Sequence, residues 1–321
     1  MHHLAGVPAS FFGMVLGVGG LGAAWRAAHD LWGLPAIIGE SLVCLGGVTW
    51  AVIAVLYVGK WWRTPEEALA ELRHPVQCCF IGLVGVGAMV VSIGLAPHGW
   101  AAGAALFWAG LTFAAGFAVW RSGLLWIGER DNSTITPVLY LPTVAGSFVA
   151  SVGLGTFGHP VLAQLAFGIG LFSWLAMESV LLHRLYTGVR LPPTLRPTLG
   201  IQLAPPVVGA LAYLAAHPGP PDLVVHALLG YAMFQAALLI RLLPWILEQP
   251  FVPAYWAFTF GATALGTVML RVVHLGGDPV LSLIAPWIFL GANLVVLIIT
   301  FGTLRLLLEG RLLPRAVEAT Q

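Results

Sequence analysis

Two carboxylates, Glu40 and Glu178, lie inside long apolar segments, where ionisable side chains are candidates for function by default. Glu178 ends the run that starts at Phe172 and stands six residues before Arg184. A carboxylate in such a position either couples transport to protons or forms a structural pair with a cation such as Arg184. The sequence leaves both interpretations of Glu178 open.

Other residue patterns that support chemistry are weak. The three cysteines, Cys44, Cys78 and Cys79, have no metal-binding spacing, and we expect free thiols. The glycine-rich stretches lack the lysine of a Walker motif and are interpreted as membrane glycines, not phosphate loops. No histidine pair stands at a spacing that suits haem. We therefore expect no cofactor, no metal and no enzymatic activity.

The composition gives the class of protein that holds these residues. Of 321 residues, 59% are hydrophobic and only 8% are charged, and the mean hydropathy is +0.92. A soluble domain is about 25% charged. The net charge of +1 provides no field for a polyanion, so a nucleic-acid partner is not expected. The chain is predicted to be an all-α integral membrane protein in a lipid bilayer, with residues 1–321 in one transmembrane domain.

A spanning helix needs about 20 apolar residues, and cuts at charged, proline and glycine clusters predict ten. They cover residues 7–28, 35–60, 75–96, 99–121, 137–158, 160–183, 198–216, 222–246, 253–274 and 279–308. This order places 12 of the 14 lysines and arginines on one side, and Arg26 and Arg271 on the other. The positive-inside rule then predicts that both termini are cytoplasmic.

The ten segments show a fivefold repeat. Each even-numbered segment ends on a basic residue: Lys60, Arg121, Arg184, Arg241 and Arg305. Each outer connection carries a histidine: His29, His98, His159, His217 and His274. The repeat predicts five helical hairpins of one orientation, about 7–60, 75–121, 137–183, 198–246 and 253–308. Odd helices rich in glycine and proline then surround a central pore, or pack as a bundle without a lumen.

If the odd helices line a pore, it is almost uncharged, with basic residues at its inner mouth. Such a pore suits small monovalent anions that bind weakly enough to leave again. Selectivity then follows the cost of dehydration, so nitrate is expected to pass more easily than chloride. Interior prolines such as Pro142 and Pro205 are expected to kink or break the odd helices and expose backbone to the lumen.

Seven segments carry a family resemblance through their order and spacing. They run from Pro8 to Gly13, Arg73 to Val76, Leu139 to Ala145, Phe172 to Leu175, Leu199 to Pro205, Arg241 to Trp245 and Tyr255 to Gly261. Over nearly the whole chain the sequence resembles the tellurite-resistance/dicarboxylate transporter family, which includes bacterial proteins of the TehA type and the slow-type anion channels of plant guard cells.

The resemblance implies ten helices in five hairpins, and a homotrimer with one pore in each protomer, in the bacterial inner membrane. It assigns the gate to Phe260 and gives Gly13 the role of making room for that ring. Gly261 follows the gate where plant channels have proline. Phe12, Phe80 and Phe148 lie at related depths on other odd helices, where they either narrow the lumen or pack. Phe258 is the neighbouring ring on another face.

Two functions follow from the resemblance. The first is a gated anion channel that passes nitrate and chloride and is occluded by Phe260, with an association to tellurite resistance. The alternative is a proton-coupled carrier of dicarboxylate, sulfite or tellurium oxyanions, for which Glu178 is the candidate coupling residue. A carrier needs two alternating gates, and the sequence offers one.

Overall fold

The computed structural model describes residues 6–128 and 130–313, and within these ranges the secondary structure is helical without strands. Ten helical segments of the described chain are long and apolar enough to cross a membrane. They run Ala9–Trp32, Ala36–Arg63, Gln77–His98, Ala101–Ile127, Pro137–Thr156, Pro160–Thr187, Pro193–Ala216, Leu223–Ile246, Pro253–Gly276 and Pro279–Leu308. The all-α membrane class and the ten spans are confirmed.

The spans alternate between buried and exposed. Odd-numbered spans are 67–72% buried within the chain and even-numbered spans only 22–28%. The buried spans contain the helices α1 (Phe12–Trp32), α4 (Leu83–Leu95), α6 (Gly146–Thr156), α8 (Ala204–Ala216) and α10 (Thr259–Gly276). Each contacts the next in this order, and α10 contacts α1, so they form a closed ring. Small residues in these helices permit the close approach.

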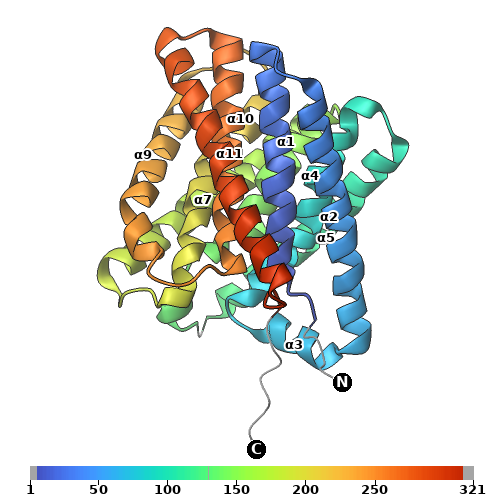
Figure 1. Cartoon of the computed structure of the whole chain (residues 1–321), viewed down its shortest axis with the longest axis vertical. Helices are drawn as coiled ribbons and strands as arrows, with labels where there is room; N and C mark the ends of the chain where they lie inside the picture. Colours follow the sequence, from blue (N-terminus) through green and yellow to red (C-terminus); the bar gives the residue numbers. More distant parts are fainter. Residues whose placement is uncertain (1–5, 129, 314–321) are drawn as a thin grey trace, which may run out of the picture.

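Five exposed helices surround the ring: α2 (Ala36–Arg63), α5 (Ala101–Ile127), α7 (Pro160–Thr187), α9 (Leu223–Ile246) and α11 (Pro279–Leu308). Each packs against the buried helix that precedes it in the chain. Figure 1 shows α1 and α10 beside α11, with α9 and α2 at opposite edges of the molecule. The apolar residues on the outer faces are those that a bilayer would cover.

Every buried span starts with an irregular segment before its α-helix. These segments are the 3₁₀ turns η1 (Ala9–Phe11), η2 (Gln77–Gly82), η5 (Pro137–Leu139), η7 (Pro193–Leu203) and η8 (Pro253–Phe258), and the π-helical η6 (Leu141–Ala145). Prolines at or near these starts remove backbone donors and disfavour α-helix before them. Such backbone is tolerated at membrane depth only where protein buries it or where it lines a cavity.

Pro142 lies within the π-helical η6, where the helix is irregular, as predicted. The predicted break at Pro205 is absent. Pro205 stands in the first turn of α8 and begins it, because the backbone N–H that proline lacks has no helical partner there. The seventh span starts at Pro193, before the predicted residue 198, because η7 adds a long 3₁₀ turn. The fourth span runs beyond Arg121 to Ile127.

A short amphipathic helix, α3 (Pro65–Arg73), joins the second and third spans and was not predicted. Its Glu71 is buried, with Oε2 2.9 Å from Lys60 Nζ. The other oxygen, Oε1, accepts the backbone N–H of Ala9 at 2.8 Å, so the carboxylate caps the first span. We call this side of the protein the α3 end; it is at the bottom of Figure 1.

Glycine contacts between α4 and α5 predict a local stability effect. A methyl group at Gly110 would lie 2.7 Å from the carbonyl oxygen of Gly85 and 2.9 Å from Ala88 Cβ. Gly110→Ala is therefore expected to lower the free energy of unfolding by about 1–3 kcal/mol through overpacking. Gly116 on the same helix has no atom within 4 Å of an added Cβ and gives the matched control. Denaturant unfolding in micelles of both variants measures the difference; equal stability would contradict this packing.

Candidate functional site

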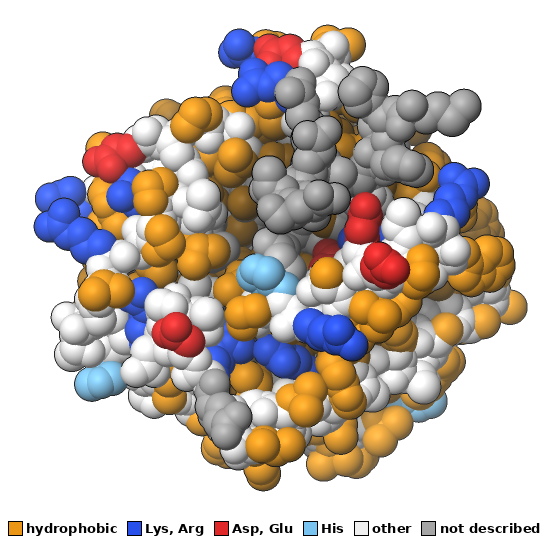
Figure 2. Space-filling model, turned by 90° about the horizontal axis from the view of Figure 1, so that it is seen from below, with side chains coloured by type: hydrophobic (Ala, Val, Ile, Leu, Met, Phe, Trp, Pro, Cys, Tyr) orange, Lys and Arg blue, Asp and Glu red, His pale blue; other side chains and the backbone are white. Residues whose placement is uncertain are grey.

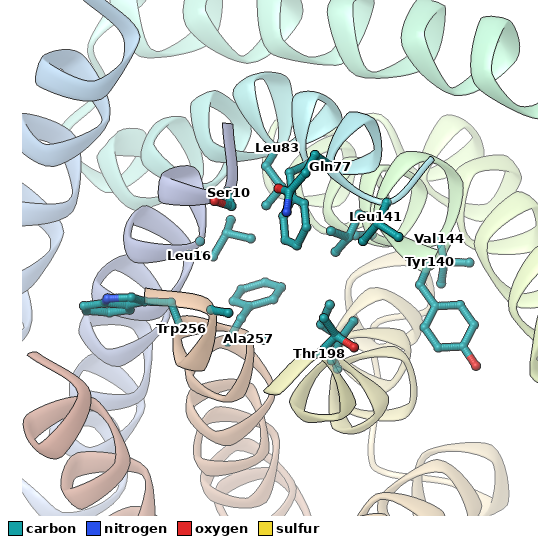
Figure 3. A pocket seen from close by; sticks show the side chains of 18 of the residues that line it. Ser10, Leu16, Gln77, Leu83, Tyr140, Leu141, Val144, Thr198, Trp256 and Ala257 are labelled. Carbon is teal, nitrogen blue, oxygen red and sulfur yellow. The ribbon is translucent and has the colours of Figure 1, made fainter. Parts of the chain in front are cut away.

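The ring of buried spans holds a cavity near the α3 end, called the lower cavity. All five buried spans line it, through residues that include Ser10, Gln77, Leu141, Thr198, Ala257 and Phe260. Its volume is about 110 Å³, which is enough to hold several water molecules. Figure 3 shows side chains from several of these segments pointing into one shared space.

The lower cavity is mostly apolar and carries no charge. Among the described residues that line it, the polar side chains belong to Ser10, Gln77, Tyr140, Thr194 and Thr198, and none is ionic. Hydroxyl and amide groups can donate a hydrogen bond to a passing anion without holding it strongly. Tyr140 contributes its ring to the wall, but its hydroxyl points away from the space (Figure 3).

A second cavity, the upper cavity, occupies the opposite end of the ring. All five buried spans line it as well, through Ala27, Val90, Val152, Leu211, Ala264 and others. Its volume of about 480 Å³ exceeds that of the lower cavity. Three charged residues line it: Arg26, Asp30 and Arg271. The cavities at the two ends of the ring therefore differ in both volume and charge.

Phe260 lines both cavities, a property it shares with Val208. Its aromatic ring is the larger of the two groups at this boundary. Phe260 stands in the first turn of α10, two residues after the end of η8, and is only partly buried. Ala264, Thr267 and Arg271 follow on the same face of α10, since helical residues three and four apart are neighbours. This face of α10 leads from Phe260 to the upper mouth.

Only some of the predicted lining residues reach these cavities. Gly13, Phe80, Phe148 and Pro205 line the lower cavity together with Phe260. Phe12 lines neither cavity; it is fully buried and packs edge-on against Tyr57, with ring centroids 6.0 Å apart. The prediction for Phe12 is wrong because adjacent residues of a helix face directions about 100° apart, and Gly13 holds the cavity side.

Gly261 is also misassigned as a lining residue. It is buried, and a Cβ there would lie 2.9 Å from Leu203 Cβ and 3.1 Å from the backbone nitrogen of Ala204. Gly261 therefore permits close contact between α10 and the start of α8, and it lines neither cavity. A bulkier residue here would push the two spans apart.

The glycine beside the ring of Phe260 is Gly20. A Cβ at Gly20 would lie 3.4 Å from Phe260 Cδ2 and 2.3 Å from Thr263 Oγ1. A Cβ at Gly13 would meet only Trp256 Cβ within 4 Å, at 3.6 Å. In this conformation the ring therefore rests near Gly20, whereas Gly13 borders open space in the lower cavity.

Glu178 is buried on α7 and lines neither cavity. Its carboxylate accepts hydrogen bonds from the hydroxyls of Tyr140 and Tyr231, the amides of Gln202 and Gln235, and the indole of Trp174. These residues come from four consecutive spans, the fifth to the eighth, which belong to the ring and its outer wall.

The predicted pairing of Glu178 with Arg184 is wrong. Arg184 Nη1 instead donates to the backbone oxygen of Val189 at 2.8 Å. The donors of Glu178 are neutral, and four of them belong to residues 24 to 57 positions away in the sequence. No spacing pattern in the sequence pointed to this network.

Two further features escaped sequence reasoning. Arg26 and Arg271 were assigned to the outer connections by charge counting, but the structure brings them to one cavity. The sequence does contain one signal for Arg271: Ala264, Thr267 and Arg271 follow Phe260 by four, seven and eleven residues, which is the spacing of one helix face. Among the described residues no cluster of potential metal ligands was found.

A closed ring of buried membrane spans, with a cavity at each end and two residues shared between the cavities, is the arrangement of a multi-pass membrane transport protein. Residues 6–304 match the family model described as SLAC1, voltage-dependent anion channel, and the chain belongs to this family. The match confirms the family that the sequence motifs predicted. Anion transport is therefore the activity that the family supports.

Curated relatives extend over most of the chain. The tellurite resistance protein TehA homolog of Haemophilus influenzae is 30% identical over 306 residues, which cover 95% of this chain and 92% of that protein. Two uncharacterized transporters of Methanocaldococcus jannaschii are 22% and 21% identical over 280 and 283 residues. Each comparison covers 78% of this chain, and 80% and 79% of those transporters.

Proposed function

We propose that this protein is a gated channel that passes small monovalent anions, including nitrate and chloride, and that Phe260 closes it. The observation that carries the proposal is that Phe260 lines both cavities of the ring. A phenyl ring at a narrow boundary excludes ions by its size, and its π-face is negative and does not attract an anion. Movement of this ring would join the two cavities into one route.

Anions are the favoured cargo because of the field at the lower cavity. The five buried spans run in the same direction, and their N-terminal segments surround this cavity. The N-terminal end of a helix carries a partial positive charge of about half an elementary charge. This field attracts an anion, and the neutral hydroxyl and amide groups on the wall bind it only weakly, as conduction requires.

The proposed orientation puts the α3 end in the cytoplasm. Figure 2 shows Lys and Arg side chains spread around this face, and the positive-inside rule assigns such a face to the cytoplasm. Both termini are then cytoplasmic, and the bilayer is the bacterial inner membrane. We further propose a homotrimer with one route in each protomer, which chemical crosslinking in mild detergent tests: monomers alone would contradict it.

The association with tellurite resistance comes from the name of the Haemophilus influenzae relative and is part of the proposal. The alternative of a proton-coupled carrier has less support. Glu178 is saturated with donors and lines neither cavity, so it lacks a path to either side. The single boundary between the two cavities also provides one gate, whereas a carrier needs two.

Bilayer recordings with nitrate on one side and chloride on the other test the proposed function. Anion currents whose reversal potential favours nitrate over chloride are expected, because nitrate loses its hydration more easily. The measurement is made on the wild type and on Phe260→Ala. Saturable uptake that depends on a proton gradient, without current in either protein, would contradict the channel and support the carrier.

A further inference from the structure

Arg271 stands at the upper end of the α10 face that begins at Phe260. It follows Phe260 by eleven residues, a rise of about 16 Å along an α-helix. Its side chain lines the upper cavity and is exposed there, although its helix is otherwise well buried. An arginine keeps its charge in such a place, because the guanidinium is not deprotonated in proteins.

The other arginine of the upper cavity, Arg26, is already satisfied. Its Nε and Nη2 atoms donate to the two carboxylate oxygens of Glu40, each at 2.7 Å, and its Nη1 donates to the Gly94 carbonyl oxygen at 2.7 Å. His98 Nε2 lies 3.0 Å from the same carboxylate. This cluster has its donors and acceptors matched, so Arg26 has little capacity left for an anion.

Arg271 differs in its partners. Within residues 6–128 and 130–313, no hydrogen bond or ion pair to the Arg271 side chain is formed. Asp30 lines the same cavity, but no ion pair joins it to Arg271. A guanidinium in a cavity walled by apolar side chains interacts with an anion more strongly than it does in bulk water.

We propose that Arg271 forms an anion-binding site in the upper cavity for planar anions with two accessible oxygens, of which nitrate is the probe. The guanidinium fork binds two oxygens at once, a geometry that a halide lacks. The cavity volume of about 480 Å³ admits such an anion together with water. This inference rests on the proposed function: an anion that enters from the upper side binds Arg271 before it moves towards Phe260. The negative charge of Asp30 in the same cavity limits how tightly the anion is held.

Conductance measurements in the Phe260→Ala background test the site. Arg271→Gln is expected to raise the nitrate concentration that gives half-maximal current from the upper side at least fivefold. Arg271→Lys keeps the charge but loses the fork, so the chloride current is retained while the preference for nitrate falls. Asp30→Asn, which removes the opposing charge, is expected to shift the half-maximal concentration downward. Equal currents in Arg271→Gln and its parent, from both sides, would overturn the proposal.

A second measurement does not depend on conduction. Nitrate that binds the folded protein raises its melting temperature by mass action. In detergent, nitrate added at constant ionic strength is expected to raise the melting temperature of the wild type more than that of Arg271→Gln. Equal shifts would overturn the site even if Phe260→Ala conducts. Unequal shifts without any current would uphold the site and contradict the channel.

Discussion

Replacing Phe260 with alanine is expected to raise the steady-state anion conductance at least ~100-fold, which corresponds to removing a barrier of about 3 kcal/mol. The physical reason is the position of the ring at the boundary that the two cavities share. The other residue at this boundary, Val208, is much smaller and lies on α8. Alanine at position 260 leaves a continuous space without changing the charge on the wall.

Phe258 provides a matched control for this variant. It lies two residues earlier, lines neither cavity, and stacks with Tyr255 at a ring-centroid distance of 6.2 Å. Its ring also packs against Gly200, where an added Cβ would lie 2.5 Å from Phe258 Cδ2. Phe258→Ala is expected to give no more anion current than the wild type in the same recordings. Currents as large as those of Phe260→Ala would mean that loosened packing opens the protein, and that Phe260 is not the gate.

Replacing Glu178 with alanine is expected to lower the free energy of unfolding by about 3–5 kcal/mol. The change leaves four buried donors and the half-buried Tyr231 without their shared acceptor, and each unsatisfied buried group costs about 1–3 kcal/mol before the structure relaxes. The network ties α7 and α9 to the irregular starts of two buried spans. Denaturant unfolding in mixed micelles measures the loss.

Glu309→Gln serves as the control, because that carboxylate lies at the surface in an exposed pair with Arg305. Exposed pairs of this kind contribute little, so no measurable change in unfolding is expected. The structural interpretation of Glu178 would be contradicted if Glu178→Ala unfolds like the wild type. If that variant were stable and its uptake lost a dependence on pH, Glu178 would instead be the coupling residue of a carrier.

The sequence predicts the spans well because the bilayer imposes a length and a polarity that hydropathy measures directly. It does not predict η7 and η8, since a 3₁₀ turn and an α-helix of the same residues have the same composition. The helix α3 was missed because its nine residues carry charges and lie outside the apolar segments. Its role depends on Glu71, whose partners Lys60 and Ala9 are 11 and 62 residues away.

Site residues are harder to predict because a lining residue is defined by the rotation of its helix. Depth alone placed Phe12, Phe80 and Phe148 together, yet Phe12 faces Tyr57 while the other two border the lower cavity. Glycines raise the same difficulty: Gly13 lines the lower cavity, whereas Gly261 allows α10 and the start of α8 to pack closely. Only the packing of the whole ring decides between these roles.

The winding of η8 sets the direction in which Phe260 points. A 3₁₀ turn advances by about 2.0 Å and 120° per residue, against about 1.5 Å and 100° in an α-helix. The six residues Pro253–Phe258 would therefore shorten by about 3 Å and turn by about 120° if they rewound as α-helix. Phe260 stands two residues after the end of this segment, so a change of helical pitch at one end of the span would rotate and shift the ring at the boundary of the two cavities.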